Sequence, residues 1–228
     1  MGEELLYLAI FKLAGGGSMM TYDLWRQKVW LPKCKRLTGQ RISEILAAVD
    51  GEKVVKYFRL RHNRQDAVWE EIYKRNPALR GRPIKYALDN TSISTYSDTI
   101  AEAQFGHAKR DPDLKQINYT VICDQCSGDI VFAHMYEGAV NDVTALSDIL
   151  HAMTNAGFDL DKNILVTDRG YSSLENIQKM INLDLKYLQG VRFVEDSLKQ
   201  NFERHKESLR KNAFFSSKEK AYAFTLKE

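Results

Sequence analysis

The sequence predicts an α/β protein in which a mixed sheet is flanked by helices and preceded by a small all-helical region. Three observations lead to this prediction. Residues 3–75 carry the apolar spacing of amphipathic helices, with glycine and proline breaks between them. Residues 84–136 contain short runs that alternate apolar and polar side chains, as half-buried strands do. After residue 142, helical and strand-like segments follow one another, which favours parallel pairing.

Length and composition allow one or two globular domains. The 228 residues are 44% hydrophobic and 28% charged, as in ordinary globular proteins. Residues 1–88 carry 17 Lys and Arg against 9 Asp and Glu, whereas residues 89–228 carry 16 against 21. A basic part joined to an acidic part points to nucleic-acid contact on one side and metal-binding carboxylates on the other. A chance imbalance on solvated faces is the alternative reading.

The cysteines and the N-terminus of the chain indicate its cellular compartment. The three cysteines are an odd number without a disulfide framework, which favours a reducing compartment. Cys123-x-x-Cys126 has neither a second pair nor a nearby histidine, so two thiols beside a hairpin are favoured over a zinc or redox site. No apolar run is long enough to span a membrane, and the acidic N-terminus lacks the basic start of a signal peptide. We therefore expect a cytoplasmic protein without membrane contact.

The N-terminal region reads as helices. An apolar helical stretch over residues 3–14 stops at three glycines, and residues 38–46 form a capped helix that begins at Thr38. A further helix begins near Glu52 and has a basic polar side, and a third segment covers residues 67–75. Basic faces of this kind suit contact with DNA phosphates. They suit an amphipathic bundle with solvated faces equally well.

A linker over residues 76–83 separates these helices from the first strand. Residues 84–88 form a short strand that ends at Asp89, and residues 105–116 read as a polar loop. Residues 117–123 and 130–136 form a hairpin around Ser127-Gly128.

The later elements alternate. A helix runs from Asp142, taken as its N-cap, to residue 156, and a strand over residues 163–167 ends at Asp168. Residues 172–182 then read as a helix, 185–189 as a strand and 195–211 as a charged helix, after which no clear element follows.

Two acids stand at the ends of predicted strands. In open α/β sheets ligands collect at the carboxyl ends of the strands, and a buried strand has no structural need for a charge there. Asp89 alone also fits a residue that starts a turn, but two such acids on separate strands of one sheet weaken that explanation. The order of three strands, a helix, a strand, a helix and a strand is that of an RNase H-like core.

Four separated blocks carry a family resemblance. They are Leu88-Asp89-Asn90-Thr91-Ser92, the polar loop with Gly106-His107-Ala108-Lys109 and Asp113-Leu114-Lys115-Gln116, Glu137-Gly138-Ala139-Val140-Asn141-Asp142, and Thr167-Asp168-Arg169-Gly170-Tyr171. In this order they resemble the DDE transposases of bacterial insertion sequences, in the branch with a β-rich insertion in the RNase H-like core. The resemblance covers residues 84–193, and less distinctively the helical region upstream.

The resemblance implies phosphoryl transfer on DNA by two Mg²⁺ (or Mn²⁺) ions. Asp89 would bridge the metals and Asp168 would bind one of them. Arg169 would hold a phosphate and Tyr171 would help to shape the site, although Arg169 also fits a surface or packing arginine. Lys109 and Lys115 are candidate contacts to the DNA backbone, or else solvated loop residues. The partners would be double-stranded element ends and target DNA, in a homodimeric transposition complex associated with the nucleoid.

One departure from the family pattern concerns its third acid, a glutamate on a helix after the insertion. Glu203 follows Asp168 by the spacing of uninterrupted members, but Phe202-Glu203-Arg204-His205 matches the expected block poorly. We therefore expect a C-terminally truncated transposase without Mg²⁺-dependent strand cleavage. Its predicted parts are a helical region over residues 1–80, the catalytic core over 81–193 and the start of the insertion over 194–228.

Two other functions remain open. The chain could be a non-catalytic, DNA-binding or regulatory remnant of a transposase, which would share every feature of the sequence. An aspartate-dependent phosphatase would need an acid two residues after its nucleophile. Thr91 occupies that position after Asp89, so this function is disfavoured.

Overall fold

The computed structural model describes residues 2–106, 111–158, 160, 163–191, 196–209, 215–216 and 221–222. The chain divides into two compact units, Met1–Ala67 and Val68–Glu228, and each is described by itself. Within the described ranges, no helix is both long and apolar enough to cross a membrane. The predicted division into three domains stays a prediction.

The first unit is helical. It contains α1 (Gly2–Leu13), η1 (Met19–Thr21), α2 (Tyr22–Arg26), α3 (Gly39–Ala47) and the first part of α4 (Gly51–Arg75). The two helical segments predicted on either side of residue 65 form the single helix α4, since no glycine or proline interrupts the chain between them. Thr38 is the N-cap of α3, as predicted, and its side chain accepts a hydrogen bond from the Arg41 N–H.

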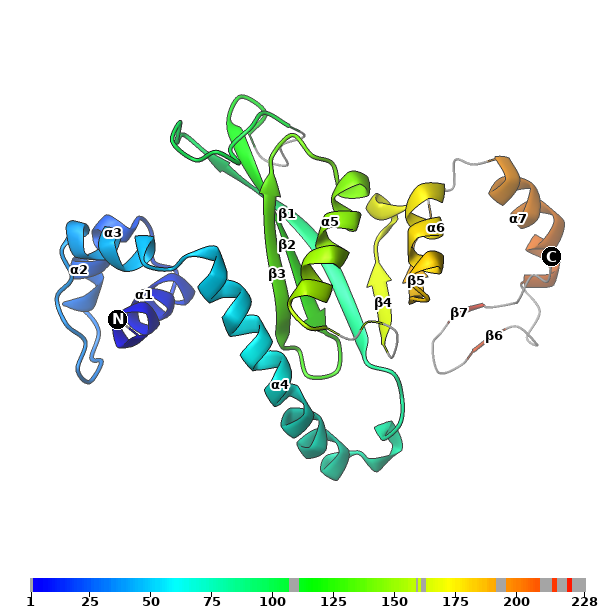
Figure 1. Cartoon of the computed structure of the whole chain (residues 1–228), viewed down its shortest axis with the longest axis horizontal. Coiled ribbons are helices and arrows are strands. Elements are labelled where there is room, and N and C mark those ends of the chain that lie inside the picture. Colours follow the sequence, from blue (N-terminus) through cyan, green and yellow to red (C-terminus); the bar gives the residue numbers. More distant parts are fainter. Residues whose placement is uncertain are drawn as a thin grey trace. The chain divides into compact units, whose positions relative to one another are not determined.

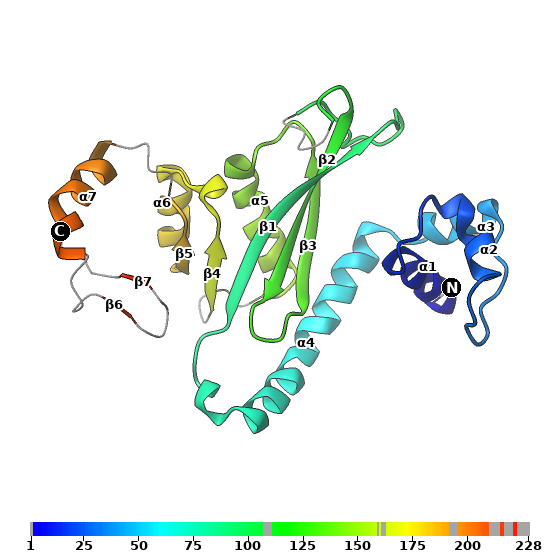
Figure 2. The same ribbon diagram turned by 180° about the vertical axis from the view of Figure 1, so that it is seen from behind.

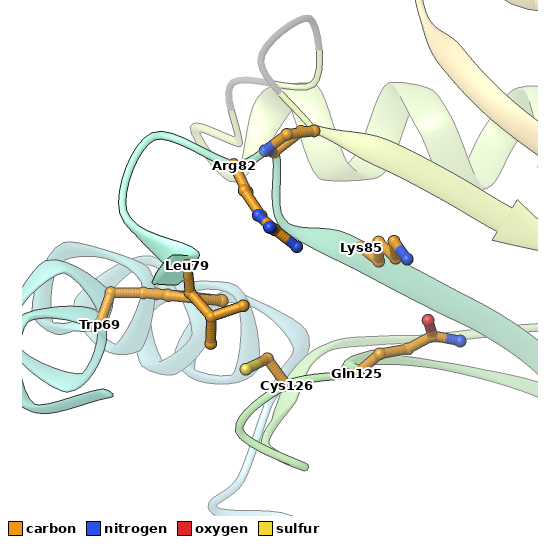
Figure 3. Close-up of a pocket in the computed structure, with 7 residues that line it drawn as sticks. Trp69, Leu79, Arg82, Lys85, Gln125 and Cys126 are labelled. Carbon is orange, nitrogen blue, oxygen red and sulfur yellow. The ribbon is translucent and has the colours of Figure 1, made fainter. Parts of the chain in front are cut away.

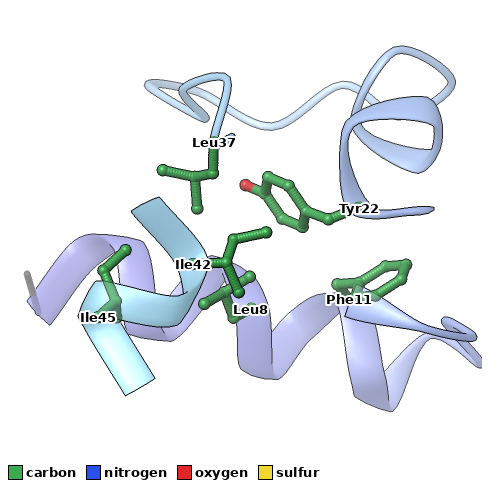
Figure 4. Packing of buried hydrophobic residues seen from close by; sticks show 6 residues of the cluster. All are labelled: Leu8, Phe11, Tyr22, Leu37, Ile42 and Ile45. Atoms are coloured by element: carbon green, nitrogen blue, oxygen red, sulfur yellow. The ribbon is translucent and has the colours of Figure 1, made fainter. Parts of the chain in front are cut away.

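A small core holds this unit together. Figure 4 shows the buried side chains that meet between α1, α2 and α3: Leu8, Phe11, Tyr22, Leu37, Ile42 and Ile45. At the edge of this core, the Arg41 guanidinium donates from Nε and Nη2 to the two oxygens of Glu4, at 3.1 and 2.8 Å. This ion pair joins α3 to α1.

The second unit is built on a five-stranded sheet with the strand order β3-β2-β1-β4-β5. The strands are β1 (Lys85–Thr95), β2 (Lys115–Asp124), β3 (Ile130–Glu137), β4 (Ile164–Thr167) and β5 (Lys186–Gln189). The first three pair antiparallel in a meander, and β4 and β5 continue the sheet parallel to β1. This is the RNase H-like arrangement, so the predicted fold class is confirmed.

Two helices cover one face of this sheet, α5 (Asp142–Asn155) and α6 (Leu174–Asn182), as Figures 1 and 2 show from opposite sides. Tyr86 of β1 faces them, because its ring lies 6.4 Å from that of Phe158, which follows α5. Side chains alternate along a strand, so Leu88 and Asn90 point to the same side as Tyr86, and Asp89 points to the opposite face.

The structure differs from the sequence prediction in several boundaries. β1 continues to Thr95, so Asp89 lies inside the strand and not at its end. The polar segment Asn90–Thr95 is held in the sheet because each residue pairs with one of β2, from Thr120 to Lys115, and this pairing overrides weak strand propensity. The charged helix is α7 (Asp196–Leu209). The tail contains the paired strands β6 (Phe215–Ser216) and β7 (Ala221–Tyr222), where no element was expected.

Candidate acidic site

Asp89 and Asp168 lie at neighbouring positions of two paired strands. The last paired residues of β1 and β4 are Leu88 and Thr167, and the two aspartates come directly after them. Neighbouring strands run about 4.8 Å apart, so the two acidic residues start from adjacent backbone positions. Both are exposed. The sheet therefore brings together the two acids that the sequence had singled out.

The end of β4 determines the hydrogen bonds around Asp89 and Asp168. β4 stops at Thr167 while β1 continues, so β1 loses its parallel neighbour beyond Leu88. The Asn90 N–H donates instead to Asp89 Oδ1, at 2.8 Å. Asp168 caps the short helix η3 (Arg169–Tyr171), with its Oδ1 accepting from the Gly170 N–H at 2.7 Å. In the part of the chain that the structure describes, Oδ2 of either aspartate has no hydrogen-bond or ion-pair partner.

A third carboxylate, that of Asp142, lies near Asp168 and contacts the residue that follows Asp89. Asp142 was expected to cap α5, but Asn141 is the N-cap and accepts from the Thr144 N–H at 2.9 Å. The Asp142 side chain turns toward the sheet, where its Oδ1 accepts from Asn90 Nδ2 at 2.5 Å and from the Tyr136 hydroxyl at 3.4 Å. Because Asn90 adjoins Asp89, this contact ties the backbone of the first acid to α5.

Two tyrosines surround the Asp142 carboxylate. Tyr171 is 1% exposed and Tyr136 is 6% exposed. The pKa of each phenol is raised, first by burial and then by the negative charge of Asp142, so both stay protonated at neutral pH. The nearby Thr120 hydroxyl acts in the opposite direction on both, although Tyr171 Oη has no hydrogen bond of normal geometry.

Two glycines permit close packing around Asp168. A Cβ on Gly170 would lie 2.9 Å from Asp168 Oδ1 and 3.3 Å from Asp142 Oδ2, so these two oxygens are separated by no more than the sum of those distances. A Cβ on Gly190, at the end of β5, would lie 3.0 Å from the Arg169 nitrogen. A side chain at Gly170 would therefore crowd the two carboxylates, and one at Gly190 would crowd the backbone of Arg169.

The other predicted site residues lie in different surroundings. Arg169 is exposed next to Asp168 and has no ion pair among the described residues. Tyr171 is inside the protein, so its side chain does not reach the surface, and a role in shaping the site stays a prediction. Lys115 pairs with Asp98 at 2.8 Å and lies six residues along β1 and β2 from Asp89, or about 20 Å. Lys109 lies outside the described residues.

The donor set fits a hard divalent cation. Mg²⁺ prefers carboxylate oxygens and commonly takes only one or two of them, with water completing its shell. Asp89 and Asp168 could supply these two. Among the described residues, no group of three His, Cys, Asp or Glu side chains is arranged to hold a metal. Glu203, on α7, pairs with Lys206 at 2.5 Å.

Sequence reasoning missed the part that Asn90 and Asp142 play. Both stood in blocks that had been singled out, but Asp142 was assigned to capping. Asn141 is as good an N-cap residue as Asp142, and only one of the two can cap the helix. Two adjacent N-cap candidates were therefore the signal in the sequence that one of them has another partner.

Comparisons with known proteins identify the family of the chain. Residues 80–221, more than half of the chain, match the family described as Transposase DDE domain. Together with the RNase H-like sheet, this match defines the class of protein: the chain belongs to the DDE transposase family. No curated protein sequence matches it significantly.

Several solved structures are similar in part. A piggyBac transposase synaptic complex with hairpin DNA is 12% identical with a TM-score of 0.44, over 88% of this chain and 44% of that one. A Mos1 transposase paired-end complex with the left transposon end is 11% identical with a TM-score of 0.32, over 92% and 72%. A simian T-cell lymphotropic virus intasome is 17% identical with a TM-score of 0.32, over 57% and 39%. The chain thus spans less than half of the first two solved relatives, the intasome and the piggyBac protein.

Proposed function

We propose that this transposase chain binds Mg²⁺ or Mn²⁺ through Asp89 and Asp168 and acts on DNA during transposition. The observation that carries the proposal is the pair of exposed carboxylates at adjacent positions of β1 and β4, without a compensating cation among the described residues. Two like charges so placed repel each other, and a divalent cation between them removes that repulsion.

A bound divalent cation would supply Lewis-acid stabilisation of the charge that develops on phosphoryl oxygens. The residues of the chain have separate tasks in this proposal. Asp89 and Asp168 each use Oδ1 to hold a backbone N–H and offer Oδ2 to the cation. Arg169, exposed directly after Asp168, would attract a DNA phosphate.

Asp142 is a positioning residue in this proposal. Its contact with the Asn90 amide fixes the residue after Asp89, and its other oxygen lies against Gly170, two residues after Asp168. A single carboxylate on α5 thereby holds the backbone on both sides of the acid pair. Outer residues of this kind orient metal ligands and tune their affinity.

The helical unit would contribute contacts to DNA. Lys56 and Arg64, eight residues apart and thus on a similar side of α4, are exposed and have no ion pair among the described residues. Lys53, in contrast, is paired with Asp50 at 2.8 Å. Cations that lack a carboxylate are the ones available to phosphates.

A non-catalytic, DNA-binding member of a transposition system is the second candidate. It is motivated by the block Phe202-Glu203-Arg204-His205, which matches the family's third acidic block poorly. In that case the chain would bind DNA, and compete with an active transposase, without cutting. Bacterial insertion-sequence origin and association with the nucleoid stay proposals of the same kind.

Metal titration tests the acid pair. We expect Mn²⁺, followed by calorimetry or by its electron paramagnetic resonance signal, to bind the wild-type chain. Asp89→Asn and Asp168→Asn should each weaken binding by at least tenfold, whereas Asp66→Asn on α4 should not change it. Wild-type binding that neither variant reduces would rule out this site.

DNA titration tests the helical unit and separates the two candidates. We expect binding to double-stranded DNA that weakens with salt. In the variant Lys56→Gln/Arg64→Gln, the slope of log K against log salt should be less steep by about 2, because two phosphate contacts are lost. The control Lys53→Gln/Lys179→Gln removes two charges that are already paired with Asp50 and Glu175. Nicking of DNA that Asp168→Asn abolishes would reject the non-catalytic candidate, and binding without nicking would favour it.

A further inference from the structure

A second candidate site lies in the sheet unit, at the start of β1. It is a pocket of about 390 Å³ lined by Trp69, Leu79, Arg82, Pro83, Lys85, Gln125 and Cys126. Figure 3 shows these side chains around one space, with Arg82 extending from above toward the gap between Leu79 and Lys85. Lys85 and Asp89 are four residues apart on β1, or about 13 Å, so this is a different place from the acid pair.

The pocket contains two positively charged side chains, those of Arg82 and Lys85. Neither Arg82 nor Lys85 has an ion-pair partner within the described ranges, whereas the nearby Arg80 pairs with Glu70 at 2.9 Å. The buried Asp124 carboxylate adjoins the wall, but its Oδ1 accepts from the N–H groups of Cys126 and Ser127 at 2.8 and 3.3 Å. Two cations without a carboxylate, one of them a guanidinium fork, are the usual partners of a phosphate.

The opposite wall is apolar and contains an unsatisfied donor. Trp69 is 7% exposed, and its indole N–H has no acceptor in the described part of the chain. A buried donor without an acceptor is costly, and an oxygen or ring nitrogen of a ligand would relieve that cost. Leu79 and Pro83 complete an apolar surface, and the Gln125 amide can both donate and accept.

The walls are held in place by the backbone. The Gln125 N–H donates to the Lys85 carbonyl at 2.9 Å, which joins the turn between β2 and β3 to the start of β1. Gly128, with a positive φ of 74°, allows that turn to close, and Asp124 fixes the residues within it. A pocket with fixed walls loses little freedom when a ligand binds.

We propose that this pocket binds a nucleotide, with the phosphate between Arg82 and Lys85 and the base against Trp69, Leu79 and Pro83. The volume exceeds what a bare phosphate needs and falls within the range of small-ligand sites. The choice of a nucleotide over another phosphorylated molecule rests on the proposed function on DNA. The same chemistry could come from a free nucleotide or from one unit of a DNA strand.

Alkylation of Cys126 tests the proposal. Cys126 is exposed and lines the pocket, while Cys34 lies in the helical unit and serves as an internal control. We expect deoxyadenosine monophosphate to slow alkylation of Cys126, followed by mass spectrometry, and to leave Cys34 unaffected. Deoxyadenosine and inorganic phosphate, each carrying half of the ligand, should protect far less. No protection at saturating nucleotide would overturn the proposal.

Substitutions in the pocket test where the ligand binds, and protection by oligonucleotides tests which ligand it is. Arg82→Gln/Lys85→Gln should weaken protection by about tenfold or more. The matched control Lys28→Gln/Lys186→Gln should not change it, and equal losses in both would argue against the pocket. Protection by single-stranded but not double-stranded oligonucleotides would identify a strand unit as the ligand, whereas protection by the monophosphate alone would identify a free nucleotide. Intact Mn²⁺ binding with no nucleotide protection rejects the pocket alone, and the reverse result rejects the acid pair alone.

Discussion

Asn90 of β1 donates its side-chain amide to the Asp142 carboxylate at the start of α5, at 2.5 Å, and the two residues are 52 positions apart in the chain. The contact joins the strand that carries Asp89 to the helix that packs over the sheet. It also places a negative charge beside Gly170, in the turn that carries Asp168. One pair of side chains thus holds together the two segments on which the proposed metal site depends.

The variant Asp142→Asn should weaken Mn²⁺ binding by tenfold or more while both proposed ligands remain in place. The reason is that a neutral amide oxygen accepts more weakly than a charged carboxylate from the Asn90 amide and the Tyr136 hydroxyl. Calorimetric titration measures the loss. Asp148→Asn, on the exposed side of the same helix, is the matched control and should bind like the wild type. If thermal stability falls in Asp142→Asn while metal affinity is unchanged, the residue is structural only.

Substitution of Gly170 by alanine should displace the Asp168 side chain. The added Cβ would lie 2.9 Å from Asp168 Oδ1, closer than carbon and oxygen pack, so the carboxylate must move. We expect Mn²⁺ affinity to fall at least as much as in Asp142→Asn, with the far-ultraviolet circular dichroism unchanged. Gly39→Ala, where a Cβ meets nothing within 4 Å, is the control. Wild-type affinity in Gly170→Ala would show that the site tolerates movement of this carboxylate.

Gly138→Ala should destabilise the sheet unit by about 2 kcal/mol or more, within the range known for overpacked sites. A Cβ there would collide with the Gln116 carbonyl and lie 2.6 Å from the Gln104 carbonyl, and both atoms belong to backbone that cannot rotate away. The urea midpoint of unfolding should fall at an unchanged slope. Gly51→Ala, in open space at the start of α4, should leave the midpoint nearly unchanged. An equal midpoint in the two variants would contradict this packing.

Acid should remove the contribution of Glu4 to the stability of the helical unit. The hydrogen bonds from Arg41 lower the pKa of Glu4 from 4.5 to about 2. A carboxyl group with a depressed pKa in the folded state contributes stability that is fully present above pH 4.5 and is lost as the pH falls toward 2.

The comparison of wild type with Glu4→Gln measures this contribution. The variant should unfold at a lower temperature than the wild type at pH 6, and the two should converge as the pH approaches 2. Glu3→Gln, at the neighbouring exposed residue, should track the wild type throughout. A difference in melting temperature between Glu4→Gln and wild type that persists unchanged at pH 2 would exclude the Arg41 pairing as its source.

Much of the fold could be predicted because local patterns and global packing agree. The Thr38 cap of α3, the hairpin of β2 and β3, and the alternation of helices and strands after Asp142 are all confirmed. The extension of β1 to Thr95 could not be predicted, because a polar run becomes a strand only when β2 lies beside it. The merging of two helical segments into α4 could not be predicted, because residues 61–66 between them are all polar and carry no apolar spacing that continues the helix.

The sequence by itself determined most of the elements of the sheet unit, the family and the choice of the two acids, because periodicity, caps and short motifs are local properties of the chain. Only the tertiary structure decided that Asp89 and Asp168 occupy adjacent positions, since the parallel register of β1 and β4 joins residues 79 positions apart. It also decided that the Asp142 side chain contacts Asn90 and Tyr136 and does not cap its helix. The physical reason is that the role of the Asp142 carboxylate follows from the donors around it. These are Asn90 of β1 and Tyr136 of β3, and packing against the sheet brings them to the start of α5.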